Sequence, residues 1–126
     1  MSAGYRLDAG KVQYSLIPPD ALEGMARVLT WACTRTTPKP YPPRNWEAGM
    51  AWSRCFDSLM RHAWAYWRGE DLDPESKLPH VDHMQVNCAF LASYFRRPWV
   101  KKYDDRYDLM RRYHEADASA RKRKKA

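Results

Sequence analysis

Apolar residues recur at helical spacing between residues 47 and 67, and this pattern limits the fold of the chain more strongly than any other. Residues three and four positions apart share one face of a helix, so the segment predicts a helix with one broad apolar stripe. We expect this helix to run from about Glu47 to Trp67. Its expected buried residues are Trp52, Cys55, Phe56, Leu59, Met60, Ala63, Tyr66 and Trp67. Such a stripe needs other apolar stripes to cover it, so further helices should pack against it.

Three other segments carry the same period. A first helix is predicted from about Asp20 to Cys33. A third helix should begin near Pro79 and end before Pro98, with a buried face made of Val81, Met84, Cys88, Leu91 and Phe95. A last helix is predicted from about Lys102 to Ala116, with the buried residues Tyr103, Tyr107, Met110 and Tyr113. Strand-like alternation is absent from the sequence, so we expect an all-α fold.

The remaining segments read as irregular structure. Residues 1–19 contain two glycines and two prolines and keep no sustained period, so they predict an irregular N-terminal arm lying along the domain. Four prolines between Thr34 and Asn45 predict a loop, because proline lacks a backbone donor and fixes its own φ. We therefore expect a small bundle of about four helices with an irregular N-terminal arm and a proline-rich loop. Residues 1–116 would form this single domain, and residues 117–126 a basic flexible tail.

The composition limits the cellular context and the partners. The chain of 126 residues has no long uninterrupted apolar run and no apolar secretory signal, so we expect a cytoplasmic protein that does not enter a membrane. Three cysteines favour neither a disulfide framework nor a thiolate zinc site. The formal charge is +7, but the run Arg121 to Lys125 supplies five of these charges. This run is a solvated tail or a site of weak nucleic-acid contact.

Histidines and carboxylates gather around the predicted turn between the second and third helices. His80, His83 and Asn87 share one side of the third helix, and His62 lies near the end of the second. Four carboxylates fall in the turn, namely Glu70, Asp71, Asp73 and Glu75. Carboxylates repel one another, so such a cluster is explained by full solvation, by helix N-terminal donors or by a bound cation. Imidazole beside carboxylate suits manganese, iron or zinc as well as magnesium.

Several motifs of known chemistry are missing from the sequence. There is no GxxxxGK[ST] phosphate loop, no GxSxG nucleophile elbow and no pair of cysteine and histidine at nucleophile spacing. Covalent catalysis is therefore not expected.

The chain resembles one family, the phage-type dATP/dGTP diphosphohydrolases, in their N-terminal domain. The resemblance covers roughly residues 6–97, and the order and spacing of the matched residues make it specific. In the first part it rests on Asp8, Gly10, Lys11, Tyr14 to Pro19, Ala21, Leu22, Ala26 and Val28. It continues with Asn45, Trp46, Gly49, Arg61, His62, Gly69, Glu70, Asp73 to Ser76, Leu78, His80, His83, Asn87, Phe90, Leu91 and Tyr94.

The resemblance implies hydrolysis of a purine deoxynucleoside triphosphate to the monophosphate and pyrophosphate, with Mg²⁺ or Mn²⁺ as cofactor. Glu70 and His83 are the candidate catalytic residues. The candidate metal ligands are His62, Glu70, Asp73, His80 and His83. The candidate substrate-binding residues are Lys11, Asn45, Trp46, Arg61 and Asn87. We also expect a homo-oligomer, located in the host cell cytoplasm if a phage encodes it.

The sequence departs from the family pattern in two places. The proline-rich residues 36–44 replace a short Lys-Tyr-Gly segment before Asn45, which leaves the choice of base open. Lys77 stands where glycine would follow Ser76. Glu70 and Asp73 fit the ExxD helix of MazG-type pyrophosphohydrolases, but no upstream ExxE occurs, so the metal site is expected to differ in kind.

Two alternatives to this function stay open. One is a deoxynucleotide triphosphohydrolase that releases triphosphate, although Asp82 and His83 stand in the reverse of the usual His-Asp order. The other is a non-catalytic phage accessory protein that binds nucleotides or nucleic acid.

Overall fold

The structure is a computed structural model that describes residues 2–125, apart from the side chains of residues 109–111. Four α-helices follow one another along the chain: α1 (Pro19–Thr34), α2 (Trp52–Trp67), α3 (His80–Arg96) and α4 (Leu109–Lys125). Three short 3-10 helices accompany them: η1 (Tyr14–Leu16), η2 (Asn45–Ala48) and η3 (Pro98–Tyr103). The described residues form no strand beyond one isolated bridge between Leu72 and Pro79. The predicted all-α class is confirmed.

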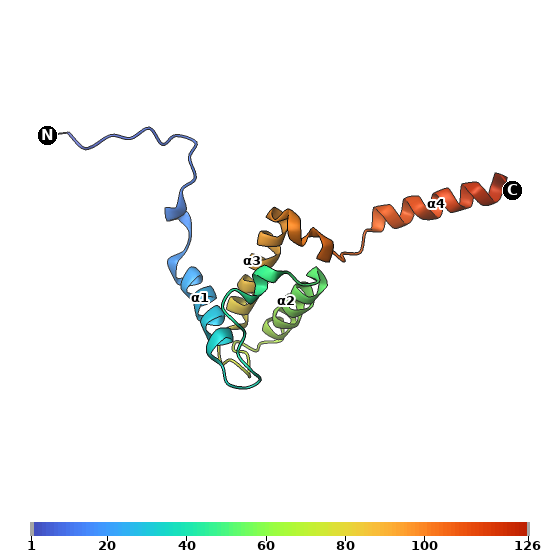
Figure 1. Ribbon diagram of the computed structural model, residues 1–126. Helices are drawn as coiled ribbons and strands as arrows, with labels where there is room; N and C mark the ends of the chain where they lie inside the picture. The colour runs from blue at the N-terminus through green and yellow to red at the C-terminus, as the bar shows by residue number, and fades with distance from the viewer. Residues whose placement is uncertain (1, 126) are drawn as a thin grey trace.

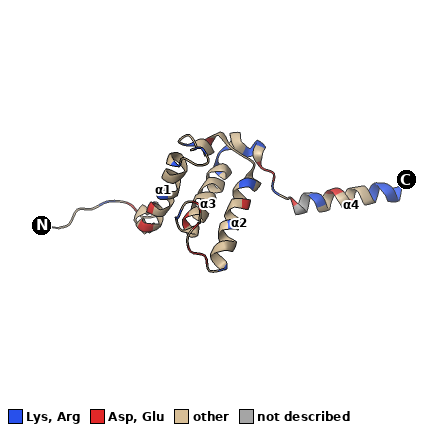
Figure 2. Ribbon diagram, turned by 90° about the horizontal axis from the view of Figure 1, so that it is seen from below, with Lys and Arg blue, Asp and Glu red and all other residues tan. Residues whose placement is uncertain are grey.

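Helix α3 is the centre of the packed body. Both α1 and α2 pack against it, and η3 folds back onto its end. Figure 2 shows α3 between the other two helices, while α4 stands apart from all three. Side chains that α3 directs toward α2 meet groups from both α2 and the turn that joins these helices.

The apolar core joins α2, α3 and the two short helices η2 and η3. Trp52, Cys55, Tyr94 and Val100 are buried there, and Trp46 packs against them. The rings of Trp52 and Tyr94 are stacked, with centroids 6.4 Å apart. The Tyr94 hydroxyl donates a hydrogen bond of 2.7 Å to the Trp46 carbonyl. This one side chain thereby fixes the loop before α2 to the central helix.

Helix α2 begins at Trp52, five residues later than the predicted Glu47. The helical course is interrupted at Gly49, where φ is +87° and where a Cβ atom would lie 2.7 Å from the Tyr103 ring. Only a residue without a Cβ tolerates both conditions, so the helix cannot continue upstream through this position. Part of the predicted apolar stripe is also exposed: Phe56, Met60, Tyr66 and Trp67.

The buried face of α3 is rotated from the predicted one. Val81, Cys88 and Phe95 are exposed, and the buried residues are His80, His83, Val86, Asn87 and Tyr94. The prediction of an apolar face was wrong here because it ranked side chains by hydrophobicity alone. Polar side chains can be buried when hydrogen-bond partners accompany them, and α2 and the turn supply those partners.

The last helix also differs from its predicted bounds of Lys102 and Ala116. Residues 98–103 form η3, and α4 begins only at Leu109. Two aspartates explain the break, because Asp104 binds the backbone and side chain of Arg106, and Asp105 accepts a hydrogen bond from the Ser53 backbone at the start of α2. Tyr107 and Tyr113 are exposed, Tyr103 is partly buried, and the Met110 side chain lies outside the described residues.

The N-terminal arm extends away from the helical body, whereas the sequence analysis placed it along the domain (Figure 1). Its large apolar side chains, including Tyr5, Leu7, Val12 and Tyr14, are exposed. Among the described residues, no helix combines the length and the apolar character that crossing a bilayer requires.

Gly24 of α1 lies against the Asp82 side chain of α3. A Cβ atom at this position would lie 2.3 Å from the Asp82 carboxylate. The Gln85 amide holds that carboxylate with a bond of 3.1 Å and also donates to the Ala21 carbonyl at 3.2 Å. Gly24 thus leaves room for the Asp82 side chain, and its own backbone conformation is ordinary helix.

We expect Gly24→Ala to lower the free energy of unfolding by about 1 kcal/mol, because overpacking at Asp82 outweighs the better helix propensity of alanine. In an Asp82→Ala background the same change should instead stabilise by about 1 kcal/mol, since the obstacle is gone. Urea denaturation of the four proteins measures both effects. A stabilising Gly24→Ala change in the unmodified chain would contradict this account of the contact.

Burial raises the pKa of Tyr94 to about 12. The unfolded chain therefore loses this proton near pH 10 while the folded chain keeps it, so stability should fall as pH rises from 10 to 12. We expect Tyr94→Phe to be less stable than the native chain at pH 7, by about 1–3 kcal/mol, because the Trp46 carbonyl loses its donor. The difference should shrink above pH 10 in denaturation curves measured at several pH values. A constant difference across this range would refute the assignment.

Candidate functional site

The turn between α2 and α3 is closed by its own backbone. Gly69, with φ +95°, ends α2. The Asp73 amide then donates to the Leu78 carbonyl at 2.8 Å, and the His80 amide donates to the Asp71 carbonyl at 2.9 Å. These bonds fold residues 70–79 back over the ends of both helices, which places the acidic side chains beside the histidines.

Asp73 is oriented by the residues that follow it. Its Oδ2 atom accepts hydrogen bonds from the backbone amides of Glu75 and Ser76, at 3.1 and 2.8 Å. Its Oδ1 atom lies 4.0 Å from Nδ1 of His62. Burial acts to raise the pKa of this carboxyl, but the bonds from Ser76 and the nearby histidines outweigh it and hold the pKa below its usual value. Asp73 is therefore a fixed carboxylate with one oxygen directed at the histidines.

His62 and His80 face each other across the two helices. Their Nδ1 atoms are 2.8 Å apart. Two lone pairs repel at such a distance, so a proton or a cation must lie between these nitrogens. Burial, and then the neighbouring His83, lower the pKa of His62 to about 4, which keeps this imidazole neutral near pH 7.

Glu70 sets the tautomer of His80. Its Oε1 atom lies 2.7 Å from Nε2 of His80, whose side chain is only 3% exposed. A carboxylate accepts a proton here, so Nε2 carries the hydrogen and Nδ1 presents its lone pair toward His62. Carboxylates hold metal-binding histidines in the same way in many metalloproteins.

His83 joins the histidine pair to a neighbouring cavity. Its ring stacks on His62, with centroids 4.3 Å apart, and meets the edge of Trp31 at 5.8 Å. Its Nε2 atom lies 2.7 Å from the Ser76 hydroxyl. Burial lowers the pKa of His83, so its ring is also neutral near pH 7. His83 is thus a buried neutral imidazole with one face on the cluster and a place in the cavity wall.

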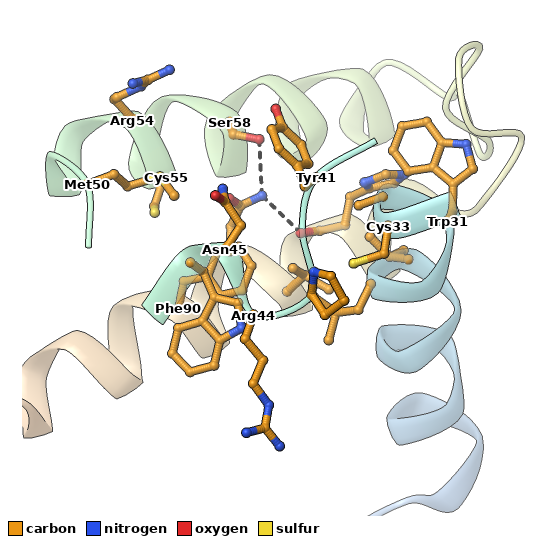
Figure 3. Close-up of a pocket in the computed structure, with 18 of the residues that line it drawn as sticks. Trp31, Cys33, Tyr41, Arg44, Asn45, Met50, Arg54, Cys55, Ser58 and Phe90 are labelled. Carbon is orange, nitrogen blue, oxygen red and sulfur yellow. Dashed lines mark hydrogen bonds between the residues drawn. The ribbon is translucent and has the colours of Figure 1, made fainter. Parts of the chain in front are cut away.

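The cavity has a volume of about 1080 Å³ and lies between α1, residues 41–50, α2 and α3. Figure 3 shows Trp31 and Cys33 of α1 on one side and Arg54 and Ser58 of α2 on another. Arg61, Asp57 and His83 also line it. The wall therefore combines cationic side chains with apolar and aromatic surface, and the space is large enough for a nucleotide.

The donor set fits a divalent metal ion. One ligand atom each from His62, Asp73 and His80 can be chosen so that all three lie within 4.8 Å of one another. Two imidazoles, which would each offer an Nδ1 lone pair once a cation replaced the shared proton, and one ionised carboxylate are ligands that suit manganese, iron and zinc. Glu70 and His83 are also predicted ligands, but they contact the imidazoles instead of this three-ligand set: Glu70 bonds to His80, and His83 stacks on His62.

The structure brings together five of the predicted site residues: His62, Glu70, Asp73, His80 and His83. It places four others in the cavity wall: Asn45, Trp46, Arg61 and Asn87. Lys11 is exposed on the N-terminal arm and belongs neither to the histidine cluster nor to the cavity wall.

Two of the predicted substrate contacts have protein partners. The Asn87 amide donates to the Ser58 hydroxyl at 3.1 Å and to the His83 carbonyl at 3.0 Å. The Trp46 ring is stacked on Phe90, with centroids 5.4 Å apart, and the Arg97 guanidinium lies 4.7 Å from its centroid. In this arrangement both side chains anchor α2, α3 and the loop before α2 to one another.

Sequence reasoning missed two residues that shape the site. Ser76 holds Asp73 and His83 at once, and only its place in the matched motif signalled it. Arg35 packs against the rings of Trp31 and Tyr41, at 5.2 and 4.6 Å, and bonds to Glu75 at 3.2 Å. No local pattern marks Arg35, because its partners lie in three separate segments.

The comparisons with known proteins agree on one family. Residues 1–106 match the sequence model of the family described as "dATP/dGTP diphosphohydrolase, N-terminal". A protein of Salmonella phage PMBT28, named dATP/dGTP diphosphohydrolase, is 32% identical to this chain over 88 residues. That alignment covers 70% of this chain and 28% of the phage protein, so the chain spans less than a third of its relative. No solved structure matches the chain.

Lys77 adopts the left-handed conformation, with φ +63°, at the position where the family pattern has glycine. A left-handed backbone costs a residue with a Cβ about 1–2 kcal/mol, and glycine removes this cost from the folded chain. Glycine also raises the entropy of the unfolded chain, which cancels part of the gain in stability. We expect Lys77→Gly to raise the free energy of unfolding by about 0.5–1 kcal/mol in urea denaturation. Lys77→Ala is the matched control and should give no such gain. Equal stability of the two variants would show that the backbone at residue 77 is not strained.

Proposed function

Because the chain belongs to the N-terminal domain family of dATP/dGTP diphosphohydrolases, we propose that it hydrolyses a purine deoxynucleoside triphosphate to the monophosphate and pyrophosphate. The family resemblance seen in the sequence is confirmed. The activity is named for a phage relative, and this chain spans 28% of that protein. The substrate, the products and the divalent metal, Mg²⁺ or Mn²⁺, are therefore parts of the proposal.

One observation supports the proposal above all others. The Nδ1 atoms of His62 and His80 are 2.8 Å apart, with the ionised Asp73 directed at them, and the His83 ring that stacks on His62 lines a cavity of nucleotide size. Nothing in the packing of an ordinary helical core requires two imidazoles, one on α2 and one on α3, to meet through the same nitrogen. A cation between them would satisfy both nitrogens and the carboxylate together.

His62, Asp73 and His80 would hold the metal. When bound, it would offset the charge of phosphate oxygens and activate water for attack on phosphorus. Glu70 would keep the His80 lone pair directed inward by holding the proton on the opposite nitrogen.

The remaining residues would act from the cavity wall. His83 is neutral and borders the cavity, so it could accept a proton from water as a general base. Arg61 would contact phosphates, since it lies in the cavity wall and its planar guanidinium can donate two parallel hydrogen bonds to phosphate oxygens. Asn45 would contact the base. Lys11 could reach a phosphate only after the N-terminal arm changes its course, so its assignment is the least supported of these.

The triphosphohydrolase alternative has weaker support. It would use Asp82 and His83 as a metal-binding pair, but the Asp82 carboxylate packs on Gly24 of α1 and accepts a bond from Gln85. Asp82 is thereby engaged in helix packing. We therefore place the release of pyrophosphate ahead of the release of triphosphate.

The decisive experiment incubates the purified chain with each deoxynucleoside triphosphate and Mg²⁺ or Mn²⁺, and identifies the products by anion-exchange chromatography. We expect pyrophosphate and monophosphate from dATP or dGTP. Triphosphate would select the alternative, and the absence of any product would refute catalysis by this chain.

The site assignment is tested by Mn²⁺ titration calorimetry, which does not depend on turnover. His62→Ala and Asp73→Asn should abolish measurable Mn²⁺ binding, and Glu70→Gln should weaken it by about 10- to 100-fold. His114→Ala is the matched control, because this histidine is exposed on α4. Far-ultraviolet circular dichroism confirms that each variant remains helical. Native affinity in both His62→Ala and Asp73→Asn would remove the proposed metal site.

A further inference from the structure

The end of α4 carries a dense group of positive charges that the proposed function does not use. Residues 121–125 are Arg, Lys, Arg, Lys and Lys, all of them helical and exposed. Figure 2 shows these residues at the far end of a helix that stands clear of the packed body. The family match ends at residue 106, so this segment lies outside the domain that holds the histidine cluster.

These cations are poorly neutralised within the chain. Arg121 forms an ion pair of 3.0 Å with Asp117, one turn earlier. None of the acidic side chains in the described part of the chain pairs with Lys122, Arg123, Lys124 or Lys125. Successive helical residues point about 100° apart, so the charges surround the helix instead of forming one stripe. Any side of the helix that meets a polyanion therefore presents positive charge.

Residues 114–125 of α4 favour one of two kinds of polyanion, because their side chains form no apolar face. An acidic membrane binds amphipathic helices by inserting large apolar side chains, in addition to charge attraction. Residues 114–125 contain no apolar side chain larger than alanine. Nothing on this part of α4 can enter a bilayer, whereas a phosphate backbone requires only positive charge.

We propose that residues 121–125 of α4 bind the phosphate backbone of nucleic acid without reading its sequence. The five residues rise about 7.5 Å along the helix, and duplex DNA carries one phosphate charge per about 1.7 Å. With Arg121 partly neutralised by Asp117, contact with about three phosphates is expected. This inference does not depend on the proposed hydrolysis. Helix α4 would keep the chain close to nucleic acid while the helical body remains free.

The test measures binding of a fluorescently labelled 20-base-pair DNA by anisotropy between 50 and 200 mM NaCl. Three phosphate contacts predict a slope of log K against log salt of about −2.7, which is about a 40-fold loss of affinity over this range. Two duplexes of unrelated sequence should bind equally. A preference of tenfold or more between them would overturn backbone recognition.

Two variants assign the binding to the tail. Replacing all five residues by Gln retains good helix formers and removes the charge, so it should reduce the salt slope to near zero. The matched control is K122R, K124R and K125R together, which keeps the charge and should bind as the native chain does. Unchanged DNA binding in the Gln variant would refute the proposal.

Two further measurements identify the source of the phosphate. Vesicles containing phosphatidylserine should not bind the chain at 100 mM NaCl, and binding to them without binding to DNA would overturn the proposal. Free dGTP at 1 mM should not displace the DNA, because a few charges on one small molecule cannot replace a polyanion. Hydrolysis by the Gln variant should equal that of the native chain, so failure here and failure of the proposed enzyme activity are separable.

Discussion

The buried polar face of α3 is the constraint on which the rest of the structure depends. His80, His83 and Asn87 are removed from water, and each would destabilise the fold without a partner. The partners come from α2, through His62 and Ser58, and from the turn, through Glu70 and Ser76. The position of α2 and the course of the turn are therefore set by polar bonds as much as by apolar contact.

This constraint also explains why the cluster is beside a cavity. A small core of Trp52, Cys55, Tyr94 and Val100 joins one end of α2 to α3 and to η3. The histidines join the opposite end of α2 to the beginning of α3. Between these two regions α1 and the proline-rich loop approach without filling the space, which leaves room lined by Arg54, Arg61 and His83. The same packing that supports the fold thus positions charged groups around a space of ligand size.

The acidic turn shows how local chemistry serves the site. Gly69 ends α2, and the backbone amides of Glu75 and Ser76 occupy one oxygen of Asp73. The other oxygen is left to face His62, although carboxylates in such a turn are ordinarily turned to solvent. Lys77 accepts a left-handed backbone so that the turn can close. The orientation of Asp73 is therefore set by bonds among residues 73–78, while the contacts with the histidines join separate elements.

The sequence by itself determined the helical class, the bounds of α1 and α3 to within a residue or two, and the candidate residues His62, Glu70, Asp73, His80 and His83. Helical period and local turn signals are short-range properties, and the matched motif adds order and spacing to them. Only the tertiary structure decided which face of α3 is buried, where α2 and α4 begin, and that Trp46 and Asn87 are held by core partners. Those outcomes depend on contacts such as Gly49 with Tyr103, His62 with His80 and Asp105 with Ser53. Residues far apart in the chain meet in each of them, and no local pattern carries that information.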